Sequence, residues 1–329
     1  MSGFQRDSHH VLFNLDEYRY SFRGLKILFL AFVVLHLIAA VLAPAAYKSI
    51  LWWYSHFPND LNTYLIGKPF PEYFDRARLL LLLLSIPWMF FQTRLLSARK
   101  LGISADRPWN FYFGWFYMVG LIWSVVVLGI LISVDAVAIK GSLGFGTLLW
   151  GLISAFLAAI LIGFLEELIF RSLFFRMFYT ALTPMVSVVL SSMFFAYMHF
   201  KQPKGLWDYD TLPTDVSWWD GFTAGFWVLF GIVVNFDLVL FLNLTLVGYS
   251  LTVVFMKTRS LWAVVGLHAG WVTPISLFMN IAVRDVDKHS LWWGTFRLAD
   301  GYLTTVCLLL IAVYFSKFYK TKKPRGFIL

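Results

Sequence analysis

Long, uninterrupted apolar runs constrain the fold of this chain more than any other feature of its sequence. Four runs have the length of about 17–25 residues that a helix needs to cross a bilayer. They are Ile27–Ala46, Phe111–Val134, Gly144–Leu165 and Leu261–Val283. Because a bilayer offers no partners for backbone N–H and C=O groups, such runs form helices. The sequence therefore predicts an all-α, polytopic membrane protein.

The remaining apolar runs bring the expected number of transmembrane helices to about eight. Leu79–Phe91, Met185–Phe200 and Tyr302–Ser316 are shorter, and each can span if flanking basic and aromatic side chains reach the interface. The stretch Gly221–Met256 holds 36 residues, which is about 54 Å of helix against a hydrocarbon core of about 30 Å. We therefore expect one crossing that ends near Met256, preceded by a re-entrant or interfacial piece.

Composition and charge agree with this class of protein. The chain is 60% hydrophobic and has a mean hydropathy of +0.72, against roughly 45–50% apolar residues in soluble domains. Its net charge of +9 comes from Lys and Arg that gather in the N-terminal segment, in 94–107, in 257–259 and in the C-terminal tail. Such clusters mark cytoplasmic loops. We expect both termini in the cytoplasm, the acidic segment 208–220 outside, and no nucleic-acid partner.

Several ionisable side chains lie in or beside the apolar runs of the C-terminal half. There a charge costs roughly 2.5–3.5 kcal/mol on insertion scales, and such residues usually face a bundle interior or a wet cavity. They are Glu166, Glu167, Arg171, His199, Asp237 and His268. Asp237 either caps the helix that follows it or lines the cavity, and we favour the cap.

Helical spacing separates the two glutamates. Glu167 and Arg171 are four residues apart on one helix face, in the acid-then-base order that favours an ion pair. A structural role for this pair is favoured over direct chemistry at roughly two to one. Glu166 points about 100° away around the helix, which leaves it without a partner on its own helix. Another helix must therefore satisfy Glu166.

His199 is the candidate partner of Glu166. The helix that carries Glu166 is expected to run to about Ala181 and to turn at Leu182–Pro184. Glu166 then lies 17 residues before Thr183, and His199 lies 16 residues after it. In an antiparallel helical hairpin these two positions come level. A carboxylate that faces an imidazole is the arrangement needed for a general base that activates water.

A second histidine, His268, lies seven residues beyond Leu261, at the start of its apolar run. Its neighbours Gly266 and Gly270 permit close helix approach, and it can face the same cavity. An imidazole there can donate a hydrogen bond to an oxygen that becomes negative in a transition state. On the residues alone, a functional and a structural role for His268 are about equally favoured.

Three motifs in this order resemble those of the CPBP family (CAAX protease and bacteriocin-processing, also called Abi) of intramembrane endopeptidases. EExxxR is Glu166–Arg171, FxxxH is Phe195–His199, with Phe195 as a supporting residue, and the third is "KTRSLWAVVGLHAGW" with His268. The resemblance covers about residues 145–275. The family's third motif ends with Asn or Asp four residues after its histidine, where this chain has Val272.

The resemblance implies a membrane-embedded glutamic-type endopeptidase that needs no cofactor. Glu166 would activate water with help from His199, and His268 would stabilise the oxyanion with fewer helpers than usual. Glu167 and Arg171 would hold the architecture. The partners would be the lipid bilayer and a peptide or a membrane-associated, prenylated-type protein, in a plasma (inner) membrane.

Two alternatives stay open on the sequence alone. A non-enzymatic membrane protein, either a transporter or a bacteriocin-immunity protein, could use Glu166, His199 and His268 as an ion or proton relay. The same three side chains also have acceptable ligand chemistry for Zn²⁺. The sequence has no HExxH motif of a zinc protease.

We divide the chain by role at residue 140. Residues 1–140 hold an N-terminal cytoplasmic segment and three transmembrane helices without an assigned role. Residues 141–329 hold the protease-like core and a basic cytoplasmic tail. The single cysteine, Cys307, excludes an intramolecular disulfide and a cysteine metal cluster.

Overall fold

The computed structural model describes residues 22–93, 95–103, 107–141, 144–200, 216–234, 236–284, 291–295 and 297–319. This part of the chain forms helices and one small two-stranded sheet. Five of its helices are long and apolar enough to cross a membrane, so the prediction of an all-α polytopic membrane protein is confirmed. Two parts of the sequence used in the topology argument lie outside the described residues: positions 208–215 of the acidic segment and much of both charged termini.

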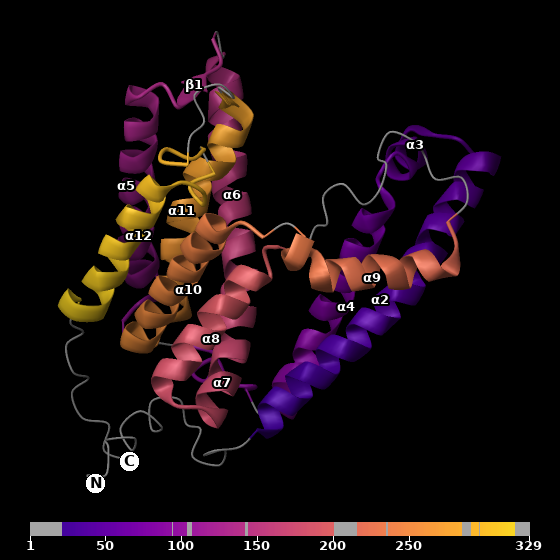
Figure 1. Cartoon of the computed structure of the whole chain (residues 1–329), viewed down its shortest axis with the longest axis horizontal. Coiled ribbons are helices and arrows are strands. Elements are labelled where there is room, and N and C mark those ends of the chain that lie inside the picture. The colour runs from indigo at the N-terminus through magenta and orange to yellow at the C-terminus, as the bar shows by residue number, and fades with distance from the viewer. Residues whose placement is uncertain are drawn as a thin grey trace. The chain divides into compact units, whose positions relative to one another are not determined.

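The chain divides into two compact units (Figure 1). These units are defined by contacts between residues, whereas the division at residue 140 separated parts of the chain by their expected function. That division stays a prediction. The first unit takes its described residues mainly from 95–196 and 237–319, and the second from 23–93, 197–200 and 216–236. Helices of the first unit are α5 (Trp109–Ser133), α6 (Phe145–Ile169), α7 (Arg176–Ala181), α8 (Pro184–Tyr197, whose last residue is assigned to the second unit), α10 (Leu238–Thr258), α11 (Leu261–Ile281) and α12 (Tyr302–Val313). Those of the second are α2 (Arg23–His56), α3 (Asp60–Ile66), α4 (Phe70–Gln92) and α9 (Trp218–Val234).

Among the candidate membrane spans, α11 is the most buried, and it packs against both α5 and α6. Glycines set its distance from α5. A Cβ at Gly266 would lie 3.0 Å from the Phe113 Cα, and one at Gly120 would lie 2.5 Å from the Leu267 carbonyl oxygen. The close approach expected at Gly266 and Gly270 is therefore confirmed. Strand β1 (Val137–Ile139) pairs antiparallel with β2 (Ala282–Arg284), which joins the ends of α5 and α11.

Gly270→Ala is expected to lower the free energy of unfolding by about 1–3 kcal/mol, because overpacking forces backbone shifts. The new Cβ would lie 2.9 Å from the Leu121 backbone nitrogen and closer still to the Tyr117 carbonyl oxygen. Gly114→Ala on α5 is the matched control, since a Cβ there meets nothing within 4 Å. Unfolding in mixed detergent micelles measures both variants. Equal stability of the two would contradict the tight α5–α11 packing.

The long helix and the hairpin that it opens were predicted from the sequence. Helix α6 continues through a π-helix (Phe170–Phe175) into α7, which ends at Ala181, and α8 begins at Pro184 and folds back beside it (Figure 1). The Phe170 and Phe195 rings lie 5.0 Å apart between centroids. This pair shows the antiparallel register of the hairpin as far as Phe195. The π-helix itself was not predicted.

The stretch Gly221–Met256 is too long for one straight transmembrane helix, so we expected an interruption in it. The helix is interrupted between α9 and α10. Asp237 precedes α10, and its Oδ1 accepts a hydrogen bond from the Leu240 backbone N–H at 2.9 Å. This is the N-cap that we favoured, since a side-chain carboxylate satisfies an otherwise unpaired helix N–H. Helix α10 then has 21 residues and is one of the five candidate spans.

In the second unit, α2 packs against α4 and α9 over an apolar core. The imidazole of His36, to which the sequence assigned no role, is buried there, and its Nε2 lies 2.9 Å from the Gly225 carbonyl oxygen. A Cβ at Gly225 would lie 3.3 Å from that nitrogen. His36 therefore acts as a packing residue between α2 and α9.

Candidate active site

Glu167 is the centre of a buried polar cluster in the first unit. Its carboxylate is fully buried and makes contacts on two sides. The Arg171 Nε lies 3.0 Å from Oε2, and the Arg171 Nη1 donates to Oε1 at 3.1 Å. His268 Nδ1 lies 2.7 Å from Oε1. The ion pair predicted from the i, i+4 spacing is confirmed, and it includes a third member from α11.

Arg171 joins four helical segments. Besides Glu167, its Nη2 donates to the Gly248 carbonyl oxygen on α10 at 3.1 Å. Its guanidinium carbon lies 4.7 Å from the centroid of the Phe195 ring on α8, within the range of a cation–π interaction. The residue is 1% exposed. A buried guanidinium with this many partners fixes the relative positions of the segments that supply them.

The aromatic residue of the FxxxH motif packs against the same cluster. Phe195 is buried, and its ring stands edge-on to the His268 imidazole with centroids 6.3 Å apart. Its location explains why a phenylalanine accompanies the charged residues. The ring covers one side of Arg171 and limits the positions open to His268.

Glu166 makes fewer direct contacts than Glu167 does. It is partly exposed, and among the described residues its Oε2 is buried without a hydrogen-bond partner. Electrostatic interactions reach from it to Arg171 and to His268. The sequence prediction that Glu166 has no partner on its own helix agrees with this geometry. A carboxylate oxygen with unused acceptor capacity is suited to bind a water molecule.

His199 lies two residues beyond the end of α8, in a turn, and is exposed. It belongs to the second unit, while Glu166 and His268 belong to the first. Its partnership with Glu166 therefore stays a prediction, carried by the hairpin register up to Phe195.

Two features of the site were missed in the sequence. Gly248 lets α10 approach α8, since a Cβ there would lie 3.0 Å from the Ser192 Cα, and its carbonyl accepts from both Arg171 and Thr252. A lone glycine within an apolar helical run was the available signal. The second is the π-helix that holds Arg171, a form often found at functional sites, for which the sequence offered no signal.

Comparison with known proteins adds a match over the same stretch. Residues 147–273 match the family model described as type II CAAX prenyl endopeptidase, Rce1-like. This stretch is a domain of that family. It contains all three motifs, and the CPBP resemblance is confirmed. No curated protein and no solved structure matches the chain.

The Rce1-like family consists of membrane endopeptidases, and the chain is an enzyme of that class. The match favours the peptidase over the non-enzymatic relay. Within the described part of the chain, no three His, Cys, Asp or Glu side chains are grouped so that they could hold a metal ion.

Proposed function

We propose that this protein hydrolyses a peptide bond of a membrane-associated or prenylated-type protein or peptide, with water activated by Glu166. The observation that carries the proposal is the contrast between two adjacent glutamates. Glu167 contacts Arg171 through both carboxylate oxygens and His268 through one, whereas Oε2 of Glu166 has neither an ion pair nor a hydrogen bond among the described residues. The family description supplies the prenyl class of substrate.

Hydrolysis in this scheme needs no covalent intermediate. Glu166 removes a proton from water, and the water oxygen forms a bond to the carbonyl carbon of the substrate. The C–N bond then breaks as its nitrogen takes up the proton, which yields a carboxylic acid and an amine. His199 assists by holding or sharing the proton with Glu166.

His268 stabilises the negative oxygen of the tetrahedral intermediate. Because the Glu167 carboxylate can only accept, the His268 Nδ1 carries the proton of their 2.7 Å contact. An imidazolium would then present Nε2–H as the donor to the oxyanion. Two carboxylates, one guanidinium and one imidazolium leave the cluster electrically neutral, which reduces the cost of burying it. Val272 adds no polar donor to this site.

The site fits a position near the cytoplasmic boundary of the membrane in the eight-helix topology with both termini inside. Glu166 lies 21 residues after Phe145, the first residue of α6, or about 32 Å along the helix, against a hydrocarbon core of about 30 Å. His268 lies seven residues after Leu261, about 10 Å from the cytoplasmic start of α11. At this depth water can reach a bond close to the membrane surface.

The test uses the purified full chain in liposomes. One peptide carries an isoprenoid thioether on a cysteine near its carboxyl end, and a control peptide of the same sequence lacks the lipid. Mass spectrometry of the products is expected to show one cleaved peptide bond beside the modified cysteine, with much slower cleavage of the control. Intact peptides after long incubation with folded protein would contradict the proposal.

A further inference from the structure

A short turn that precedes α5 in the chain contacts two elements of the candidate active site. It consists of residues 97–103 and belongs to the first unit, as the buried polar cluster does. This 97–103 turn lies outside the stretch 147–273 that matches the Rce1-like model, in the part of the chain to which the sequence assigned no role. The turn is therefore a feature of this chain that the family match does not include.

Backbone hydrogen bonds close the turn on itself. The Gly102 N–H donates to the Arg99 carbonyl oxygen at 3.1 Å. The Ile103 N–H donates to the Ala98 carbonyl oxygen at 2.8 Å. Gly102 has a φ of +78°, and two such bonds around a left-handed glycine form the Schellman motif that ends a helical turn. These bonds use N–H groups of the turn and leave the carbonyls of its last three residues for contacts with other segments.

Two carbonyls of the turn accept hydrogen bonds from the π-helix and from α11. The Ser172 Oγ donates to the Leu101 carbonyl oxygen at 2.7 Å, and Ser172 follows Arg171 in the π-helix. The N–H of Leu261, the first residue of α11, donates to the Gly102 carbonyl oxygen at 2.7 Å. Both donor residues are buried. The turn therefore holds the segment that supplies the arginine of the cluster beside the helix that supplies its histidine.

Trp262 makes a third bond to the turn and extends the contact to α6. Its Nε1 donates to the Ile103 carbonyl oxygen at 3.1 Å, and its ring lies 5.7 Å from the Phe164 ring between centroids. Phe164 lies two residues before Glu166 on α6. Trp262 lies six residues before His268 on α11, about 9 Å along the helix. The Trp262 side chain therefore contributes to the spacing of α6 and α11 close to the two reacting groups.

We propose that the 97–103 turn positions His268 against Glu167, with Trp262 and Ser172 as the positioning residues that bind the turn. This inference rests on the proposed function, in which His268 stabilises the oxyanion. The 2.7 Å contact between Glu167 Oε1 and His268 Nδ1 joins two helices, and a hydrogen bond weakens when either helix is displaced. Since a misplacement of about 1 Å can cost about 10²-fold in rate, loss of one bond to the turn slows catalysis while the substrate still binds.

Trp262→Phe tests the positioning role, because phenylalanine keeps an aromatic ring near Phe164 and removes the N–H that binds the Ile103 carbonyl. Trp123→Phe on α5 is the matched control, since the Trp123 Nε1 has no hydrogen-bond partner among the described residues. With the isoprenoid peptide, we expect Trp262→Phe to lower kcat by about tenfold and to change KM by less than about twofold. Trp123→Phe is expected to leave both constants near their wild-type values.

Two further comparisons separate positioning from a general loss of structure. In a His268→Ala background, Trp262→Phe is expected to lower the rate by less than about twofold, because substitutions that act through one group are not additive. Ser172→Ala removes the other side-chain donor to the turn and is expected to lower kcat as Trp262→Phe does. Its control is Ser191→Ala, whose hydroxyl bonds within its own helix, α8. An equal loss with and without His268, or equal effects of the two serine variants, would overturn the inference.

A spectroscopic measurement separates this inference from the proposed function, because it needs no substrate. The His268 Nδ1–H, bonded to Glu167 at 2.7 Å, is expected to give a downfield proton resonance that is absent from His268→Ala. We expect its exchange with water to be about tenfold faster in Trp262→Phe and unchanged in Trp123→Phe. This result in a protein that cleaves no peptide would support the positioning role and contradict only the proposed function. Absence of the resonance from the wild type, or equal exchange in wild type and both tryptophan variants, would overturn the positioning role whatever the cleavage assay shows.

Discussion

Glu166→Gln is expected to lower the rate of peptide cleavage by about 10²–10⁴-fold, the contribution typical of a general base. Glutamine keeps the size of the side chain and removes the group that accepts a proton from water. Since Oε2 of Glu166 has no hydrogen-bond partner among the described residues, the substitution breaks no structural contact there. Cleavage at saturating peptide concentration and the unfolding midpoint are measured together.

Glu167→Gln is the matched comparison at the neighbouring position. It removes a buried charge that both Arg171 and His268 contact, so its unfolding midpoint is expected to fall while that of Glu166→Gln stays near the wild-type value. If Glu166→Gln cleaved at the wild-type rate, the assignment of the base would be wrong. If both variants lost stability equally, the contrast between the two glutamates would be wrong.

Arg171→Met is expected to lower the free energy of unfolding by about 3–5 kcal/mol, the range for breaking a buried ion pair by removal of one partner. Methionine retains much of the volume that packs on Phe195. It leaves the Glu167 carboxylate buried without the Arg171 guanidinium, and it leaves the Gly248 carbonyl without the Arg171 donor. Unfolding in mixed detergent micelles is the measurement.

The double variant Glu167→Gln/Arg171→Met separates charge from packing. Both charges are then absent, and the glutamine can still bond to His268. Because replacing both members of a buried pair is often nearly neutral, the double variant is expected to be more stable than Arg171→Met alone. A double variant that is the less stable of the two would show that the loss comes from packing on Phe195.

Local sequence spacing predicted the parts of the site that lie on one helix or one hairpin. The Glu167–Arg171 pair follows from four residues of separation, and the turn at Leu182–Pro184 follows from proline and the length of the run. The N-cap at Asp237 follows from a carboxylate in front of an apolar run. Each depends on contacts close in sequence, where the helical period fixes which side chains meet.

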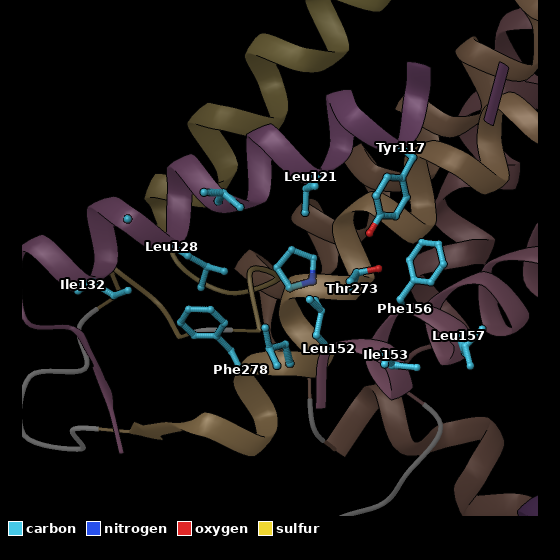
Figure 2. A pocket seen from close by; sticks show the side chains of 14 residues that line it. Tyr117, Leu121, Leu128, Ile132, Leu152, Ile153, Phe156, Leu157, Thr273 and Phe278 are labelled. Carbon is cyan, nitrogen blue, oxygen red and sulfur yellow. The ribbon is translucent and has the colours of Figure 1, made fainter. Parts of the chain in front are cut away.

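Contacts between distant helices were not predictable in the same way. The Glu167–His268 bond joins residues 101 apart, and the sequence placed His268 in the cavity without identifying its partner. An apolar groove with a volume of about 680 Å³ lies along α5, α6 and α11 (Figure 2). It depends on how three helices leave space between them, which residue spacing on each helix does not specify. The acceptor at Gly248 is a backbone carbonyl, and its glycine contributes no side-chain signal.

The match to the Rce1-like model extends to residue 273 and so includes Val272, where the family's third motif has Asn or Asp. Valine has no hydrogen-bond donor or acceptor in its side chain. The His268 imidazole, fixed by Glu167, is therefore the side chain to which we assign oxyanion stabilisation. In this assignment the third motif acts through His268 alone, and the position of His268 depends on its contact with Glu167.

The most direct test of the central claim is cleavage of the isoprenoid peptide by chelator-treated protein, with wild type, Glu166→Gln and His199→Ala compared at equal folded concentration. Glutamate-activated water predicts that wild-type cleavage survives chelation, that Glu166→Gln is slowed by about 10²–10⁴-fold, and that His199→Ala is strongly impaired. Cleavage that disappears on chelation and returns with Zn²⁺, or that stays near the wild-type rate in Glu166→Gln, would contradict the account.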